Sequence, residues 1–260
     1  MAVVGTRLGR IGVEERGSGG VPLVLLHGVG SDKRVWTPQL THFGEQRHTV
    51  AVDYPGYGES EFMPGATRED FARTILAAMD ALGIAEAHVC GLSLGGVVAI
   101  AMHAAAPERC ASQILADTFA AHPDGRTIYE RSMAGARELG MRGLAEARAD
   151  ALLALPVDPA VRAEVVETMS RIDPAAYELG AAAVWLADQR ERVAAIACPT
   201  LILCGTEDRI TPPTLSEDLK DRIPHAGLVE IAGAGHLSNL ERPVVFNRVL
   251  EAFLAGLEAG

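Results

Sequence analysis

One serine in this sequence lies in a context that suits nucleophilic chemistry. Ser93 is the centre of a Gly-x-Ser-x-Gly pattern, with Gly91 and Gly95 two residues away on either side. A short apolar run precedes the pattern, and an Ala-rich segment with helical spacing follows it over residues 97–106. A sharp turn from a strand into a helix exposes a serine hydroxyl and leaves little room for side chains at the flanking positions. The sequence therefore predicts that Ser93 is a nucleophile on such a turn.

A serine nucleophile needs a histidine base, and His236 is the candidate among the eight histidines of the chain. It ends a glycine-rich loop, Gly-Ala-Gly-His at residues 233–236, directly after the last predicted strand. A loop in that place can deliver a side chain to the edge of the sheet where the serine turn also lies. The other histidines fall on predicted helices, strand starts or polar loops, where we expect packing or solvated roles.

Two aspartates are candidates for the acid that orients His236. Asp208 follows the predicted strand at residues 200–204, and Asp117 follows the predicted strand at residues 112–116. Both lie where a carboxylate can reach a loop histidine. Asp208 is preferred, because it keeps the chain order serine, acid, histidine that is typical of a nucleophile on a strand-to-helix turn.

Strands that alternate with helices are expected to hold these residues in place. Short apolar runs predict the strands, and amphipathic segments between them predict the helices. The alternation is typical of an α/β fold with a mostly parallel sheet covered by helices on both faces. The predicted strands are 11–15, 22–26, 49–52, 88–90, 112–116, 200–204 and 228–231, and the predicted helices include one that Thr67 opens and one over 243–257.

The alternation stops between Phe119 and Arg192. This segment is rich in Ala, Arg and Glu and predicts several short helices without a strand. A helical insertion after a strand would lie over the carboxyl ends of the sheet as a lid. We therefore predict an α/β core of residues 1–118 and 193–260, with a small helical lid of residues 119–192 inserted in it.

The composition indicates a globular protein and narrows its partners. The chain has 260 residues, 48% of them hydrophobic, and a formal net charge of −11 at pH 7. That charge argues against nucleic acid and against anionic membrane surfaces as partners. No apolar run approaches the roughly 18 residues of a membrane span, and the first residues lack a secretory-signal pattern. We expect a cytoplasmic protein, whose four scattered cysteines are reduced and buried. The sequence predicts no oligomeric state.

Three motifs, in this order, resemble those of the α/β-hydrolase fold. They are His-Gly-Val-Gly at residues 27–30, the serine turn at 91–96 and Gly-Ala-Gly-His at 233–236. Residues 53–60 also resemble that family's Asp-x-x-Gly-x-Gly-x-Ser turn, and the match covers nearly the whole chain outside the predicted lid. The resemblance implies that the backbone N–H groups of Val29 and Leu94 form an oxyanion hole, and that His27 braces the first of these loops.

Within this fold the chain resembles 3-oxoadipate enol-lactonases and small carboxylesterases, through residues 30–36, the serine turn and residues 173–177. The resemblance implies a small-molecule ester or lactone as substrate, an acyl-enzyme on Ser93, and no metal or organic cofactor. General short-chain carboxylesterases, haloperoxidase-like esterases and carbon–carbon bond hydrolases use the same catalytic residues. A non-catalytic small-molecule receptor on this fold is a further alternative.

Three side chains are candidates for substrate contacts. Lys33 and Arg34 follow the predicted oxyanion loop, and a carboxylate-bearing lactone would need a local cation in so acidic a protein. Solvation at a helix start is the alternative role for both cations. Trp185, in the predicted lid, could close the apolar side of the pocket or belong to the core.

Overall fold

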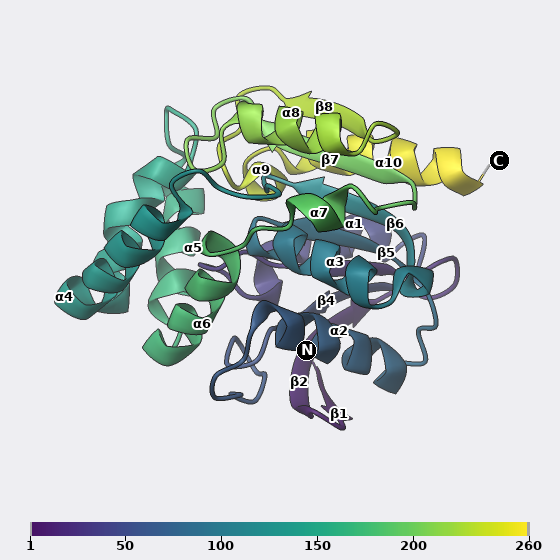
Figure 1. Ribbon diagram of the computed structural model, residues 1–260, viewed down its shortest axis with the longest axis horizontal. Coiled ribbons are helices and arrows are strands. Elements are labelled where there is room, and N and C mark those ends of the chain that lie inside the picture. Colours follow the sequence, from purple (N-terminus) through teal and green to yellow (C-terminus); the bar gives the residue numbers. More distant parts are fainter. Residues whose placement is uncertain (1, 259–260) are drawn as a thin grey trace.

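The protein is built around one twisted, mostly parallel sheet of eight strands, which the computed structural model describes over residues 2–258 (Figure 1). The strand order is β1-β2-β4-β3-β5-β6-β7-β8. β2 is antiparallel to both of its neighbours, and every other neighbouring pair is parallel. The predicted α/β fold class is confirmed. The strands are β1 (Ala2–Thr6), β2 (Gly9–Arg16), β3 (Leu23–Leu26), β4 (Thr49–Val52), β5 (Ala87–Leu92), β6 (Cys110–Ala116), β7 (Thr200–Gly205) and β8 (Gly227–Ile231).

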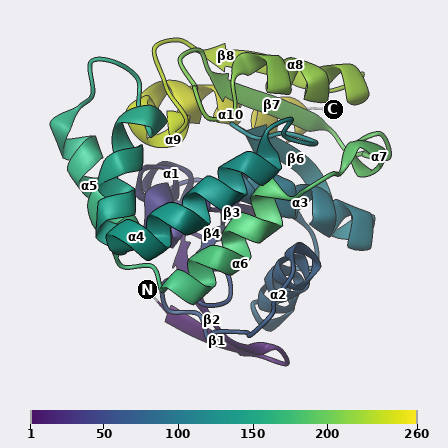
Figure 2. The ribbon, with the colours of Figure 1, turned by 60° about the vertical axis from the view of Figure 1, so that its left-hand side comes forward.

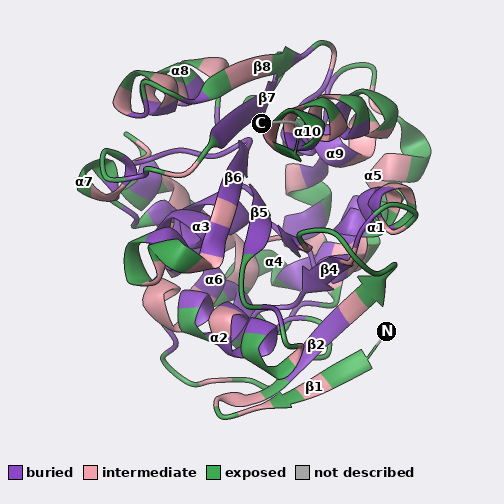
Figure 3. Cartoon of the chain, turned by 90° about the vertical axis from the view of Figure 1, so that its right-hand side faces the viewer, coloured by how far each residue is buried: buried purple, intermediate pink, exposed green. Residues whose placement is uncertain are grey.

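Helices cover both faces of this sheet (Figures 1 and 3). On one face lie α2 (Arg68–Ala81), α3 (Leu94–Ala105) and α8 (Pro213–Arg222). On the other face lie α1 (Thr37–Phe43) and α10 (Pro243–Glu258). Every residue of strands β3, β4, β5 and β7 is buried, as expected for continuous apolar runs between two helical layers. The core is therefore formed by the strands and the inner sides of these helices.

The start of α2 shows how the sequence fixes one of these helices. The Thr67 side chain accepts a hydrogen bond from the N–H of Asp70, whose carboxylate accepts one from the N–H of Thr67 in return. This capping box satisfies two N–H groups that have no partner within the helix. Phe71, Ile75 and Met79 follow at intervals of four residues and are all buried. The helix predicted to open at Thr67 is confirmed.

Four helices occupy the segment between β6 and β7, and we call this segment the helical insertion. They are α4 (Gly125–Leu152), α5 (Pro159–Ser170), α6 (Pro174–Trp185) and α7 (Arg190–Val193). The range of α4 is broken at Gly140, where φ is 66° and ψ is 173°, so α4 consists of two shorter helical stretches, as the sequence predicts for this segment. In Figure 2, α4 and α6 cross in front of one end of the sheet.

The parallel strands point their carboxyl ends toward the same edge of the sheet. Ser93 directly follows β5, Asp117 directly follows β6, and Asp208 lies three residues beyond β7. This arrangement brings residues from distant parts of the sequence to one place. Shorter elements are η1 (Lys33–Trp36), η2 (Pro107–Arg109) and α9 (Ser238–Glu241). Within residues 2–258, no helix combines the length and apolarity needed to cross a membrane.

Candidate active site

Ser93 lies on a strained turn between β5 and α3. Its φ is 55° and its ψ is −113°, a backbone conformation that a non-glycine residue rarely adopts. A Cβ atom on Gly91 would lie 2.2 Å from the carbonyl carbon of Gly95, and one on Gly95 would lie 2.1 Å from the carbonyl oxygen of Leu26. Only glycine fits at either position, so the two glycines allow the turn that presents the Ser93 hydroxyl.

The imidazole of His236 contacts this hydroxyl. Its Nε2 atom lies 3.0 Å from Ser93 Oγ, and its ring is buried. His236 comes from the loop between β8 and α9, and its backbone N–H donates a 2.8 Å hydrogen bond to the carbonyl of Leu152. Leu152 is the last residue of α4. The histidine backbone is therefore held by the helical insertion and not by the core alone.

Asp208 holds the other side of the imidazole. Its Oδ2 atom lies 2.8 Å from His236 Nδ1. The same carboxylate accepts hydrogen bonds from the N–H of Ile210 at 2.7 Å and the hydroxyl of Thr211 at 2.6 Å. Burial raises the pKa of Asp208, but the charge of His236 and these hydrogen bonds outweigh burial and lower it. An ionised Asp208 accepts from Nδ1–H, so Nε2 is left free to accept the Ser93 proton.

The same contacts set the basicity of His236. Burial alone would lower its pKa, but the carboxylate of Asp208 and the hydrogen bond to it raise the pKa above the usual value of 6.5. The nearby carboxyl of Asp117 acts in the same direction, whereas the positive charge of Arg148 opposes it. The imidazolium that forms when Ser93 gives up its proton is therefore stabilised mainly by Asp208.

Asp117, the alternative acid, does not hydrogen-bond to His236. It is fully buried, has a φ of 47°, and accepts a 2.8 Å hydrogen bond from the N–H of Gly205. Its second oxygen is hydrogen-bonded to the hydroxyl of Ser238. Burial and the charge of Asp208 raise the pKa of Asp117 to about 8. Asp117 therefore holds a proton more readily than Asp208 does, and its carboxyl group lies beside the hydrogen-bonded chain of Asp208, His236 and Ser93, outside it.

The loop after β3 lies against the nucleophile. A Cβ atom on Gly28 would lie 3.5 Å from Ser93 Cβ, and Val29 lines the cavity above the serine. His27 Nδ1 lies 2.8 Å from the carbonyl oxygen of Gly28 and so braces the loop. Leu94 is the first residue of α3, and its N–H has no acceptor one turn earlier in that helix. Val29 and Leu94 therefore both lie next to Ser93, and the oxyanion role of their N–H groups stays a prediction.

A small cavity opens over Ser93 and His236, between the core and the helical insertion. Trp185 lines it and also belongs to the hydrophobic core, where its ring stacks on Phe119 with ring centroids 5.9 Å apart. Most of the other lining side chains are apolar. The lining residues are Gly28, Val29, Gly30, Ser31, Ser93, Arg148, Leu152, Val165, Met169, Tyr177, Trp185, His236 and Leu237.

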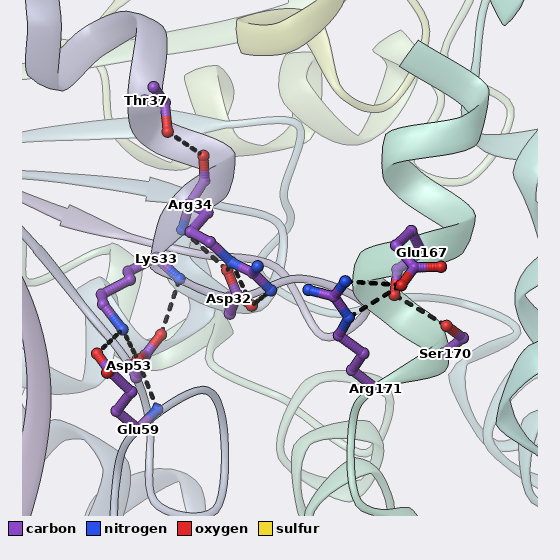
Figure 4. Close-up of polar contacts among 9 residues, drawn as sticks. All are labelled: Asp32, Lys33, Arg34, Thr37, Asp53, Glu59, Glu167, Ser170 and Arg171. Carbon is purple, nitrogen blue, oxygen red and sulfur yellow. Dashed lines mark hydrogen bonds and ion pairs between the residues drawn. The ribbon is translucent and has the colours of Figure 1, made fainter. Parts of the chain in front are cut away.

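Lys33 is not among these lining residues, contrary to its predicted role as a substrate contact. Its ammonium group is buried and lies 2.5 Å from a carboxylate oxygen of Asp53 and 2.8 Å from one of Glu59 (Figure 4). Burial lowers the pKa of Lys33, but the two carboxylates raise it by more. The side chain therefore ties the loop after β3 to the turn after β4, and its charge is already neutralised.

Arg34 likewise lies outside the cavity. Its guanidinium binds the carboxylate of Asp32, two residues earlier, with Nε 3.0 Å from Oδ1 (Figure 4). Both Lys33 and Arg34 line a separate groove, together with Arg171 and Asp173 of the helical insertion. The helical turn at η1 directs these side chains away from Ser93, and the spacing of charges in the sequence does not reveal that direction.

The sequence prediction missed Arg148, which lines the cavity from α4. It is one of five arginines in that helix, and no motif distinguishes it from the other four. Among residues 2–258, no three His, Cys, Asp or Glu side chains gather in a way that would hold a metal ion.

Comparison with known proteins agrees with this geometry. A model of the alpha/beta hydrolase family matches residues 23–249. The chain is 28% identical over 244 residues to 3-oxoadipate enol-lactonase 1 of Acinetobacter baylyi, covering 91% of this chain and 89% of that protein.

Two solved structures are similar over almost their whole length. The enol-lactonase of Burkholderia xenovorans superposes with a TM-score of 0.92 at 27% identity, over 98% of this chain and 100% of that one. A thermophilic esterase of Thermogutta terrifontis, with malate bound, superposes with a TM-score of 0.91 at 28% identity, over 98% of each chain. The strand order, the serine turn and the family match over residues 23–249 lead to one conclusion: the chain belongs to the alpha/beta hydrolase family.

Proposed function

We propose that the protein is a serine hydrolase that cleaves a carboxylic ester or lactone through an acyl-enzyme on Ser93. The observation that carries this proposal is the unbroken hydrogen-bonded chain from Asp208 through His236 to Ser93, at the base of a largely apolar cavity. The enol-lactonase and esterase relatives support a carboxylic ester or lactone as the substrate class.

Each group in the chain has a defined part in the first step. His236 Nε2 takes the proton of Ser93 as Oγ attacks the carbonyl carbon, and Asp208 stabilises the imidazolium that results. The N–H groups of Val29 and Leu94 hold the developing oxyanion, and each such donor is typically worth about 3 kcal/mol of barrier. His236 then returns the proton to the leaving oxygen.

A water molecule completes the cycle. His236 removes a proton from the water as it attacks the acyl-enzyme, and Ser93 leaves with that proton restored. In a lactone, the leaving oxygen remains tethered to the acyl group. The ring-opened product therefore departs only after the water has cleaved the bond to Ser93. The strained backbone at Ser93 keeps the hydroxyl in place through both steps.

Turnover of a chromogenic ester tests the proposal. The protein should hydrolyse 4-nitrophenyl butyrate with many turnovers per molecule, and a fluorophosphonate should label Ser93 and stop the reaction. Ser93→Ala should fold normally, resist labelling and lose activity by several orders of magnitude. Labelling at a different serine, or an active Ser93→Ala variant, would exclude the assignment. Binding of esters without any turnover would favour a receptor.

A further inference from the structure

Arg148 is the cation that faces the reacting groups. It lies on α4 in the helical insertion and lines the same cavity as Ser93 and His236. Among the described residues that line this cavity, Arg148 is the only Arg, Lys, Asp or Glu. The cavity is otherwise formed by glycines, apolar side chains and neutral polar groups, so one positive charge dominates its electrostatics.

This guanidinium has neutral partners only. Its Nη1 atom donates to the hydroxyl of Ser132 at 2.8 Å and to that of Tyr177 at 3.2 Å. No carboxylate within residues 2–258 forms an ion pair with it. Several arginines of the helical insertion pair with carboxylates, among them Arg142 and Arg171 with Glu167, and Arg162 with Asp150. Arg126, Arg131 and Arg137 form no ion pair with a described residue but are exposed to solvent. Arg148 thus has no counter-ion, in a chain with 34 acidic residues.

The two neutral contacts fix the orientation of Arg148 without using all of its donors. Both go to Nη1, so the Nε–H and the Nη2 hydrogens make no hydrogen bond to any described residue. Nε–H and one Nη2–H lie side by side on a guanidinium and match the two oxygens of a carboxylate. An arginine whose only role was to hydrogen-bond two hydroxyl groups would need neither free N–H donors nor a positive charge without a counter-ion.

We infer that Arg148 binds a carboxylate on the substrate, so that the ester or lactone this protein prefers is an anion. The inference rests on the proposed function and adds the charge of the substrate to it. The protein's net charge of −11 repels anions at long range. A bidentate contact inside the cavity supplies local attraction where the carbonyl group must be positioned over Ser93.

The position of Arg148 also links substrate binding to the chemistry at His236. The positive charge of Arg148 disfavours the imidazolium form of His236 in the empty cavity. A carboxylate bound to Arg148 neutralises that charge at the time when His236 must accept the Ser93 proton. An anionic substrate therefore reduces the electrostatic opposition to proton transfer, and a neutral ester of the same size does not.

Hydrolysis of two matched pairs of alkyl esters tests the inference. Monomethyl succinate and monomethyl glutarate carry the free carboxylate, and methyl butyrate and methyl pentanoate lack it. All four can be followed by alkali uptake at about pH 8, where imidazole is mostly neutral. Arg148→Met should lower the anionic-to-neutral ratio of kcat/KM by about 10- to 100-fold. Arg148→Lys keeps the positive charge but loses the two parallel N–H donors, so it should lower this ratio by less.

Arg137→Met is the matched control. Arg137 lies on the same helix, is exposed and does not line the cavity, so the variant changes net charge equally. Its ratio should equal that of the wild type. A ratio unchanged by Arg148→Met overturns the inference, because a contact with the carboxylate must favour the anionic esters. A ratio lowered equally by Arg137→Met also overturns it, because the effect would then come from the net charge of the protein.

A binding measurement separates this inference from the proposed function. Glutarate should bind the wild-type protein, as followed by NMR titration, and Arg148→Met should weaken that binding at least tenfold. On the Ser93→Ala variant, which cannot turn over the esters, the binding of monomethyl glutarate can be compared with that of methyl pentanoate in the same way. If no ester is hydrolysed but glutarate binding depends on Arg148, the proposed function fails and the carboxylate site stands. If glutarate does not bind in the cavity, or binds equally to both proteins, the carboxylate site is excluded.

Discussion

Asp117 and Asp208 follow neighbouring parallel strands, yet of these two carboxylates only that of Asp208 is hydrogen-bonded to His236 in the described structure. Asp117 is instead bound to the N–H of Gly205 and the hydroxyl of Ser238. Each acid has its own set of donors, and the pKa values of the two carboxyl groups are shifted in opposite directions. Burial beside the ionised Asp208 raises the pKa of Asp117 to about 8.

The two aspartates should therefore respond differently to the same substitution. Asp208→Asn removes the acceptor for Nδ1–H and permits the wrong tautomer of His236, so kcat on 4-nitrophenyl butyrate should fall by up to about 10⁴-fold. Asp117→Asn leaves the hydrogen bonds from Asp208 through His236 to Ser93 in place, and kcat should stay within a few-fold of the wild type. A larger loss from Asp117→Asn than from Asp208→Asn would show that the acid is on the other strand.

Lys33 should matter for stability rather than for substrate selection. Lys33→Met leaves the buried carboxylate of Asp53 without its cation, and loss of one partner of a buried pair costs about 3 kcal/mol. Arg34→Met removes a partly exposed pair with Asp32, worth about 0–1 kcal/mol. Urea unfolding of both variants measures the difference. Equal losses would contradict the burial of the first pair, and a selective loss on anionic esters would restore Lys33 as a substrate contact.

The pH dependence of catalysis follows from the groups around His236. Asp208 and Asp117 raise its pKa, and Arg148 and burial lower it, with a net result above 6.5. The imidazole must be neutral to accept a proton, so activity should be lost as the pH falls through that raised pKa. The acid limb of kcat/KM for 4-nitrophenyl butyrate, which reports the free enzyme, should have its midpoint above 6.5.

Removal of one cation should shift this limb in a known direction. Without the charge of Arg148 the imidazolium of His236 is easier to form, so Arg148→Met should move the acid limb to higher pH. Arg137→Met has the same change in net charge but lies on the exposed side of α4, and its limb should match the wild type. A shift toward lower pH in Arg148→Met would contradict the electrostatic account of His236.

Two glycine substitutions should have opposite effects on stability. Gly95→Ala places a methyl group 2.1 Å from the carbonyl oxygen of Leu26, so the serine turn must distort and both stability and activity should fall. Gly256→Ala meets no atom within 4 Å on the exposed side of α10, and the unfolded chain loses freedom. The second variant should gain about 0.5 kcal/mol in the free energy of unfolding. Thermal and urea unfolding check both predictions.

Much of the fold could be predicted because short stretches of the sequence determine its strands and turns. Strand β4 was predicted to the residue, and the predicted end of β6 at Ala116 is confirmed. Glycine patterns around Ser93 and before His236 predict turns, and turns are local. Ser93 Oγ and His236 Nε2 lie 3.0 Å apart because the two turns follow parallel strands that end at the same edge of the sheet.

The cavity walls could not be predicted in the same way. Side-chain direction in the insertion depends on how α4 and α6 pack, and neither the break at Gly140 nor the face of Arg148 leaves a pattern in the sequence. The sequence predicts that Lys33 contacts the substrate. It gives no sign that the carboxylate of Asp53, twenty residues later, will neutralise the charge of Lys33. The sequence does not show which of its cations lines the cavity.

The hydrogen bond from the N–H of His236 to the carbonyl of Leu152 also limits which replacements the helical insertion tolerates. The Glu241 carboxylate adds to it, accepting from the N–H of Ala154 at 2.7 Å and from that of Gly235 at 3.0 Å. A chimera in which the whole helical insertion was exchanged would lose the hydrogen bonds that hold the backbone of His236 and the loop before it. The walls of the cavity are therefore changed more safely by replacing single side chains along α4 than by exchanging the helical insertion as a whole.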